Sequence, residues 1–460
     1  MRHIIFTYFL ALFLFGCNNN DAPIAPVPVV TTPTEPKEFG TPFADVPSVK
    51  DMVFYEVNMR AFSSAGDFKG VQARLDSIKA LSVNVLWLMP IHPVGQLKSV
   101  GQLGSPYSVR DYQAVNPEFG TIEDLQNLVK EAHNRKMAVV IDWVANHTAW
   151  DNDWLTKNPN WYTKDAAGNI TIPSGTNWQD VADLNFDNAE MRKEMINSMK
   201  YWIYKTNIDG FRCDAADFVP FDFWKQANDS LQKLTTRKII MLAEGSRVDH
   251  FTAGFQLNYA WDFFGKAKNV YKNNQSATGF LSLQQSEYNN LPTNAQKLRF
   301  TTNHDESAWD DTPVKLFGNA KGAMGAFIIS TFMGGVPLIY AGQEVGRVDK
   351  TPFFSKSPID WTANADYFNE FKNVMAFRQS SPVLRDGTLE TFNDNDVMVF
   401  KKKLNGAEVL VMVNTRNATI NYNLPTALNN TNWKNALTNA TLPLSNSVSF
   451  QPFQYFILKQ

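Results

Sequence analysis

Acidic residues recur directly after apolar, strand-like stretches of this chain. In a barrel of parallel strands, the carboxyl ends of all the strands open onto one face, where active sites lie. Acids that converge there would weaken a core, whereas paired carboxylates in different environments suit the cleavage of a glycosidic bond. Four strings show the pattern: Asp142-Trp143-Val144-Ala145-Asn146-His147, Gly210-Phe211-Arg212-Cys213-Asp214, Ala243-Glu244-Gly245 and Asn303-His304-Asp305.

Apolar runs alternate with amphipathic stretches from residue 51 onward. This alternation predicts a parallel sheet with right-handed crossovers, and eight repeats predict a closed (β/α)8 TIM barrel. A doubly wound open sheet is the alternative, but it would normally offer one ligand crevice. The expected strands are Val53–Val57, Val83–Leu88, Ala138–Ile141, Ile208–Cys213, Ile239–Ala243, Gln256–Tyr259, Leu298–Thr301 and Val336–Tyr340. The expected helices are Val71–Leu81, Ile122–Arg135, Ala189–Lys205, Phe223–Leu234, Gly318–Met333 and Tyr367–Arg378.

Two further parts are expected beside the barrel, which we place at residues 48–385. The connection after the third strand is long and rich in tryptophan, and loops of that length are usually functional, so we expect a short inserted subdomain at residues 148–185. After about residue 386 the helical periodicity stops, and alternating runs with Asn-rich turns predict a C-terminal antiparallel β-sandwich at 386–460.

The N-terminus predicts the location of the protein. An apolar run from Ile4 to Phe15 is too short to span a bilayer but suits a signal peptide. Gly16 and Cys17 then resemble a bacterial lipobox, which implies residues 1–17 as a signal peptide with lipidation of Cys17; an ordinary signal peptide is the alternative. The Pro-rich residues 18–47 predict an extended tether. We therefore expect a bacterial membrane-anchored lipoprotein, on the outer membrane facing the periplasm or the cell surface.

Composition excludes some functions. The formal net charge of -2 argues against a nucleic acid partner. Two cysteines cannot form a disulfide framework, and Cys213 is expected to be a buried, inert thiol. The 12 tryptophans suit either core packing or platforms for sugar rings.

Together the four strings resemble the α-amylase family of glycoside hydrolases (family 13), in the order and at the spacings of that family. The similarity extends from about residue 51 to the C-terminus and implies the same barrel, inserted subdomain and terminal β domain. Three further strings agree with it: Gly104-Ser105-Pro106-Tyr107-Ser108-Val109-Arg110-Asp111-Tyr112, Asp183-Leu184-Asn185 and Gly335-Val336-Pro337-Leu338-Ile339-Tyr340-Ala341-Gly342-Gln343-Glu344.

The resemblance implies a role for each matching acid. Asp214 matches the nucleophile, Glu244 the general acid/base and Asp305 the third carboxylate, which stabilises the transition state. Arg212 shares a strand face with Asp214 and is expected to favour its ionised form by charge pairing. Glu244 must be protonated in the first step, so its pKa should be raised.

Other residues match positions that hold the substrate or a metal. Tyr107 matches the platform under the cleaved sugar, His147 and His304 match hydrogen-bonding residues, and Asp142 matches a supporting carboxylate. Asn146 matches a possible ligand of a structural calcium ion. The histidine that often completes that site is replaced by Phe218, so Asn146 could instead only hydrogen-bond its loop. No organic cofactor is expected.

The resemblance implies retaining, endo-type hydrolysis of α-1,4-glucosidic bonds in starch, maltodextrin or related α-glucans. A transglycosylase or sugar isomerase, including pullulan- or cyclodextrin-active relatives, is an alternative because water and sugar compete for the same covalent intermediate. A non-catalytic glycan-binding protein on the same fold is a third possibility, but such proteins typically lose the acids, and Asp214, Glu244 and Asp305 are all present.

Overall fold

The computed structural model describes residues 38–460 except 235, 290 and 393. The expected signal peptide, the lipidation site at Cys17 and residues 18–37 of the expected tether lie outside the described residues. The remainder of that tether, residues 38–47, contacts the barrel. The Phe43 ring stacks on His133 at 4.3 Å, and the Phe39 backbone N–H donates to the Tyr204 carbonyl at 2.7 Å.

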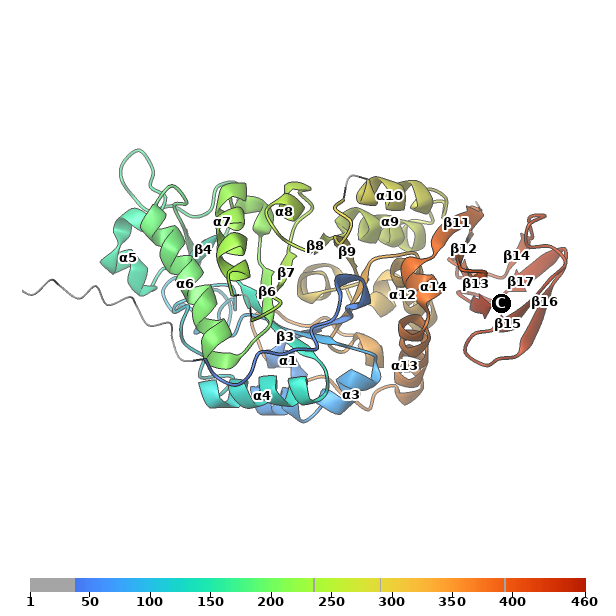
Figure 1. Cartoon of the computed structure of the whole chain (residues 1–460), viewed down its shortest axis with the longest axis horizontal. Coiled ribbons are helices and arrows are strands. Elements are labelled where there is room, and N and C mark those ends of the chain that lie inside the picture. Colours follow the sequence, from blue (N-terminus) through green and yellow to red (C-terminus); the bar gives the residue numbers. More distant parts are fainter. Residues whose placement is uncertain (1–37, 235, 290, 393) are drawn as a thin grey trace, which may run out of the picture. The chain divides into compact units, whose positions relative to one another are not determined.

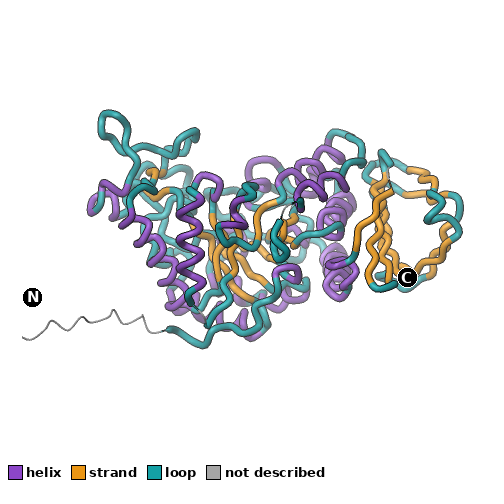
Figure 2. The backbone as a smooth tube through the Cα atoms, turned by 45° about the horizontal axis from the view of Figure 1, so that its top comes forward, coloured by secondary structure: helices purple, strands orange, loops and turns teal. Residues whose placement is uncertain are grey.

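Eight parallel strands close into a barrel, which confirms the TIM-barrel prediction (Figures 1 and 2). Each expected run forms one strand, with ends that shift by at most two residues. The six residues of β3 are all buried because helices cover the outer face of a parallel barrel and side chains fill its interior. The strands are β1 (Phe54–Val57), β2 (Val85–Leu88), β3 (Ala138–Trp143), β6 (Gly210–Cys213), β7 (Ile240–Ala243), β8 (Leu257–Tyr259), β9 (Gln296–Arg299) and β10 (Val336–Tyr340).

The helices surround the strands. The expected helix at Val71–Leu81 is divided into two, and two helices that the sequence analysis did not anticipate follow β8. The longer helices are α2 (Phe68–Gln72), α3 (Leu75–Ala80), α4 (Ile122–Asn134), α6 (Ala189–Thr206), α7 (Phe221–Gln232), α9 (Trp261–Lys272), α10 (Phe280–Tyr288), α12 (Ala320–Phe332) and α13 (Ala365–Ser380). The short ones are α1 (Met59–Phe62), α5 (Asp153–Lys157), α8 (Asp249–Thr252), α11 (Pro313–Leu316) and α14 (Pro382–Asp386). Single turns are η1 (Val49–Asp51), η2 (Pro159–Trp161), η3 (Ala216–Phe218), η4 (Glu306–Asp310) and η5 (Gln343–Val345).

Local signals define the ends of these helices. In α4 the Thr121 hydroxyl accepts from the Asp124 backbone N–H, and the Asp124 carboxylate accepts from the Thr121 N–H, which forms a capping box. The Asn188 side chain caps α6, and Asn207 ends that helix in the left-handed conformation. None of the helices in the described part of the chain has the length and apolarity needed to cross a membrane.

A small subdomain follows β3. The strands β4 (His147–Ala149) and β5 (Val181–Asp183) pair antiparallel and hold the two ends of the connection together. Between them lie α5, η2, which ends at Trp161, and loop segments that carry Trp150 and Trp178. The first residue of β4, His147, follows the end of β3 at Trp143 closely and therefore lies at the edge of the barrel opening.

The C-terminal strands form two antiparallel sheets, of six and two strands, after α14 ends at Asp386. Side chains on β12 and β13 alternate between two cores: Val397 and Val399 pack towards the two-stranded sheet, whereas Met398 and Phe400 join the barrel core. The large sheet is therefore covered on both faces. Its strands are β11 (Thr388–Phe392), β12 (Val397–Leu404), β13 (Ala407–Asn414), β15 (Thr431–Asn435), β16 (Thr441–Leu444) and β18 (Tyr455–Lys459), and the small sheet consists of β14 (Ile420–Asn423) and β17 (Ser447–Phe450).

Close packing of the large sheet on the barrel requires a small residue in α12. A Cβ atom at Gly325 would lie 2.9 Å from both Val413 Cγ1 and Tyr271 Oη. Arg416 adds a polar contact between the two parts, because its Nη1 donates to the Val270 carbonyl at 2.6 Å. The interface is therefore both apolar and hydrogen-bonded.

We expect Gly325→Val to lower the free energy of unfolding by about 1–3 kcal/mol, because the new side chain overpacks the contact between α12 and β13. Gly265→Val is the matched control: Gly265 lies inside α9, and a Cβ atom added there would have nothing within 4 Å, so its effect should stay within about 0.5 kcal/mol. Denaturant unfolding followed by circular dichroism measures both. Equal effects of the two substitutions would contradict this account of the interface.

Candidate active site

A cleft of about 760 Å³ opens at the carboxyl ends of the barrel strands. The structure brings together the predicted site residues at this place. Asp214 follows β6, Glu244 follows β7 and Asp305 lies after β9, immediately before η4. Asp142 and Arg212 lie on β3 and β6 below the cleft and are fully buried. The predicted residues that line the cleft are Tyr107, His147, Asp214, Glu244, His304 and Asp305.

Arg212 joins three of the acids. Its Nη1 donates to Asp142 Oδ1 at 2.8 Å and to Asp214 Oδ1 at 3.0 Å. Its Nη2 lies 2.8 Å from Glu244 Oε1. Burial disfavours the guanidinium charge, but the facing carboxylates raise the pKa of Arg212, which remains a cation. One buried cation therefore compensates the negative charge around it.

Asp214 and Glu244 hold their protons more tightly than free carboxylic acids do. Burial raises the pKa of Asp214 well above its ordinary value, and Glu244 adds to this, whereas Arg212 acts in the opposite direction. Burial and Asp305 likewise raise the pKa of Glu244, as the sequence analysis expected, against the lowering effect of Arg212. Arg212 thus favours ionised Asp214 as expected, but burial outweighs it. The pair retains a proton at a pH where isolated carboxyls have lost theirs.

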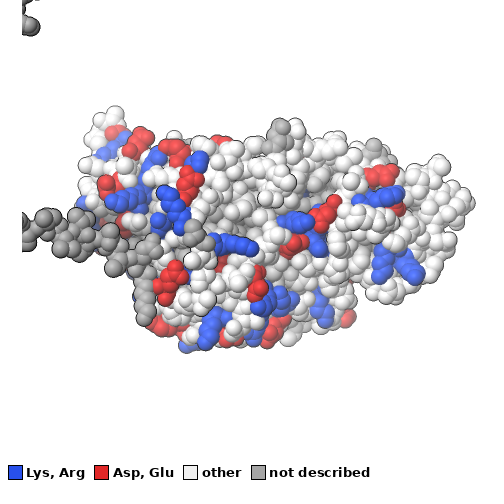
Figure 3. Space-filling model, in the orientation of Figure 1, with Lys and Arg blue, Asp and Glu red and all other residues white. Residues whose placement is uncertain are grey.

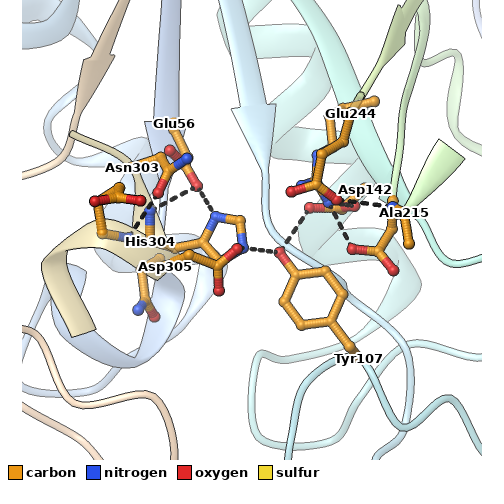
Figure 4. Close-up of polar contacts among 12 residues, drawn as sticks. Glu56, Tyr107, Asp142, Ala215, Glu244, Asn303, His304 and Asp305 are labelled. Carbon is orange, nitrogen blue, oxygen red and sulfur yellow. Dashed lines mark hydrogen bonds and ion pairs between the residues drawn. The ribbon is translucent and has the colours of Figure 1, made fainter. Parts of the chain in front are cut away.

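Tyr107 links the two sides of the site (Figure 4). Its hydroxyl lies 3.0 Å from Asp142 Oδ2 and 2.7 Å from His304 Nε2. On its other side the His304 ring places Nδ1 against Glu56 Oε1. Sequence reasoning missed Glu56, although a signal was present: it is the only charged residue in the apolar run Phe54–Val57 of β1.

His147 and Asn146 lie at the start of the inserted subdomain. Burial lowers the pKa of His147 to about 4, so the imidazole is neutral, and Trp178 packs against it edge to face at 5.4 Å. The Asn146 side-chain amide lies 3.2 Å from His147 Nδ1, and its backbone carbonyl accepts from the Leu184 N–H. Asn146 therefore connects the barrel to the subdomain.

A calcium site at Asn146 stays a prediction of the resemblance. Among the described residues no group of three or more His, Cys, Asp or Glu side chains gathers in a metal-binding arrangement. The side chain of Phe218, which takes the position of the expected histidine, has no atom that binds a metal ion, and its ring centroid lies 5.8 Å from that of Trp178. Calcium needs six to eight oxygen ligands, and the side chains of Asn146 and Phe218 supply one of them at most.

Aromatic side chains flank the acids on two sides of the cleft. Trp178 of the subdomain and Phe218 of η3 form one pair, and the side chain of Phe218 is exposed. On the other side Phe353 stacks on Tyr107 at 5.7 Å and packs against Trp309, which is 62% exposed. Sequence reasoning considered Phe218 only as the replacement of a calcium-site histidine and did not identify Trp309 or Phe353, because nothing in the sequence distinguishes an exposed aromatic from a buried one.

Glu244 is held in position by the backbone around it. Its Oε2 accepts from the Ala215 N–H at 2.7 Å, which ties it to the residue after Asp214. The next residue, Gly245, lies so close to Asp217 that a Cβ atom there would be 2.3 Å from Asp217 Oδ1. Asp217 in turn accepts from the Ser246 and Arg247 N–H groups. Only a glycine at position 245 allows the loop after β7 to pass this close to the Asp217 carboxylate.

Comparison with known proteins places this geometry in a family. The model of the α-amylase catalytic domain matches residues 43–398, so the chain belongs to the α-amylase family. It is an α-amylase-type glycoside hydrolase of family 13.

Individual relatives agree with this assignment. The chain is 26% identical over 450 residues to alpha-amylase 3 of Dictyoglomus thermophilum, with 82% of this chain and 87% of the relative covered. An α-amylase from Lactobacillus plantarum superposes with a TM-score of 0.80 at 28% identity, covering 90% of this chain and 99% of that one. A noncanonic maltogenic α-amylase, AmyB from Thermotoga neapolitana, gives a TM-score of 0.80 at 26% identity over the same shares.

We expect Gly245→Ala to lower kcat by tenfold or more, because the clash with Asp217 displaces Glu244, and a misplacement of about 1 Å costs roughly 10²-fold in rate. Gly279→Ala is the control: Gly279 has a φ of +89°, but its nearest heavy atom, Lys266 Nζ, lies 4.0 Å from an added Cβ. Steady-state kinetics on maltodextrin compare the two variants. Full activity of Gly245→Ala would show that the contact with Asp217 does not position Glu244.

Proposed function

We propose that this protein hydrolyses α-1,4-glucosidic bonds of starch-type α-glucans with retention of anomeric configuration. One observation carries the proposal: Asp214 and Glu244, at the ends of neighbouring strands, both contact a single buried arginine, and burial raises the pKa of each carboxyl. A retaining glycosidase needs this combination, with one ionised carboxylate as nucleophile and one protonated carboxyl as acid.

The reaction takes place in two displacements. In the first, the Asp214 oxygen that is not bonded to Arg212 attacks the anomeric carbon while Glu244 gives its proton to the glycosidic oxygen, and the C–O bond breaks. In the second, Glu244 removes a proton from water, the water oxygen attacks the anomeric carbon, and the ester to Asp214 is cleaved. Asp305 and Arg212 provide the electrostatic setting for the oxocarbenium-like transition states.

The position of Glu244 gives the cleft a direction. The acid must reach the leaving oxygen, so the departing part of the glucan lies on the side of Glu244. Glu244 contacts Ala215 and adjoins η3, so the departing sugars would lie towards Phe218 and Trp178. The sugar that becomes attached to Asp214 would lie against Tyr107 and His304, towards Phe353. Aromatic surface on both sides supports binding of several glucose units and an endo-type action.

Transglycosylation is a second candidate. An aromatic pair on the departing side would also retain a sugar acceptor, which then competes with water for the glycosyl ester.

The surface charge agrees with a neutral glucan: on the face shown in Figure 3, Lys and Arg are interspersed with Asp and Glu, and the formal net charge is -2. Such a surface lacks the field that attracts a polyanion.

The mechanism predicts that Asp214→Asn and Glu244→Gln each lower kcat on maltodextrin by at least about 10³-fold while the fold is kept. Wild-type enzyme should release the α-anomer first, which NMR of the fresh products detects. A β-anomer as the first product would rule out retention. Release of sugars from cellulose or pectin, but not from starch, would rule out the substrate class.

Phe218→Ala should reduce kcat/KM for maltoheptaose by up to about tenfold, since burying a ring against a sugar contributes an energy of roughly this size. The same variant should keep its kcat/KM for α-maltotriosyl fluoride, whose leaving group is too small to reach Phe218. Phe221→Ala serves as the control, because Phe221 is half-exposed at the start of α7 and does not line the cleft. An equal loss on both substrates would place Phe218 outside the departing side.

A further inference from the structure

Glu56 is a buried carboxylate on a barrel strand whose hydrogen bonds, among the described residues, all go to His304. It lies on β1, is fully buried, and its Oε1 contacts His304 Nδ1 and, at 3.4 Å, the His304 backbone N–H. Its other oxygen, Oε2, is buried and makes no hydrogen bond to any described residue. An unpaired polar atom at such a position destabilises the fold, so a functional reason is expected.

The His304 ring is enclosed by charged and polar groups from several elements. Glu56 faces its Nδ1 from β1, and Asp305 Oδ2 lies 3.4 Å from its Nε2. Tyr107, from the loop after β2, also contacts Nε2, and Trp87 of β2 packs edge to face at 6.0 Å. Charges that act on the ring over longer distances are Arg212 of β6 and Glu244, which follows β7.

The protonation of His304 decides the direction of the hydrogen bonds around Tyr107. If His304 is neutral with its proton on Nδ1, then Nε2 is an acceptor, and the Tyr107 proton must point to it. Asp142 Oδ2 then loses the Tyr107 hydroxyl as a donor. If His304 is an imidazolium, Nε2 is a donor, and the Tyr107 hydroxyl accepts from it and donates to Asp142 Oδ2.

We propose that Glu56 is a positioning residue that keeps His304 doubly protonated, so that the direction of the chain from His304 through Tyr107 to Asp142 is fixed (Figure 4). The proposal rests on the function proposed above, because Tyr107 and His304 border the sugar at the cleavage point. This arrangement fixes the Tyr107 ring under the sugar, because its hydroxyl accepts a hydrogen bond from His304 and donates one to Asp142. It also places the positive charge of His304 beside Asp305.

The electrostatics agree with this geometry. Burial alone would lower the pKa of His304, but Asp305 and Glu56 raise it to about 9. A raised pKa means that the imidazolium persists through neutral pH and is lost only as the pH approaches 9. Without the Glu56 charge, burial and Arg212 would act against Asp305 alone, so His304 would lose its proton at a lower pH.

The experiment compares Glu56→Gln with Glu344→Gln. Glu344→Gln is the matched control. Glu344 is also buried beside β1, where it accepts a hydrogen bond from Tyr55 Oη, but it does not line the cleft. For Glu56→Gln, the alkaline limb of kcat/KM on maltodextrin should move down by about 1–3 pH units while activity near pH 5–6 is largely kept. Glu344→Gln should leave the limb where it is. A uniform loss at all pH values, or an unmoved limb, would overturn the proposal.

Nitrogen NMR of histidine-labelled protein provides a readout that does not depend on catalysis. In the wild-type protein at pH 7.5, both ring nitrogens of His304 should show the shifts of an imidazolium, with His304→Gln used to assign the signal. A neutral ring at that pH would overturn the proposal. If the NMR result holds but no α-glucan is cleaved, the proposed function fails and the role of Glu56 in the protonation of His304 stands.

Discussion

The site depends on the burial of Arg212 among carboxylates. A guanidinium without solvent is unfavourable unless acids surround it, and two nearby acids without a cation could not both be accommodated. Arg212 and its partners therefore require each other: Asp142 anchors it from β3, and Asp214 and Glu244 approach it from the cleft side. Removal of the arginine would affect the protonation, position and folding of the site together.

The barrel makes this arrangement possible by its register. Asp142 pairs with Arg212 across β3 and β6, and Arg212 pairs with Leu242 across β6 and β7, so consecutive strands present their ends at the same level. Short connections after the strands then place Asp214 and Glu244 at the opening. The connection after β3 is extended into a subdomain, and its contribution to the cleft is an aromatic side chain, Trp178, beside the neutral His147.

Much of the barrel and of the candidate site was predictable, because parallel strands that are buried on both faces consist of runs of apolar residues. All eight barrel strands and the residues gathered at their ends came from that pattern and from the strings that follow it. The helices α9 and α10 were missed: α9 is rich in aromatic residues and contains Gly265, which weaken its helical signal, while packing against the barrel stabilises it. Glu56 was missed because its importance comes from His304, which is distant in sequence and adjacent only in the closed barrel. The aromatic pairs were missed because their exposure is a property of the loops around them.

The two-faced sheet formed by β12 and β13 has a mechanical consequence. Because one face shares the barrel core and the other closes its own small core, the C-terminal part has no loosely packed boundary along which it could swing. Rigid-body motion between parts of the chain is thus a poor means of admitting a long polymer. We therefore expect any opening of the cleft to come from the segments above the barrel strands: the loops that carry Trp178 and Phe353, and η4, which carries Trp309.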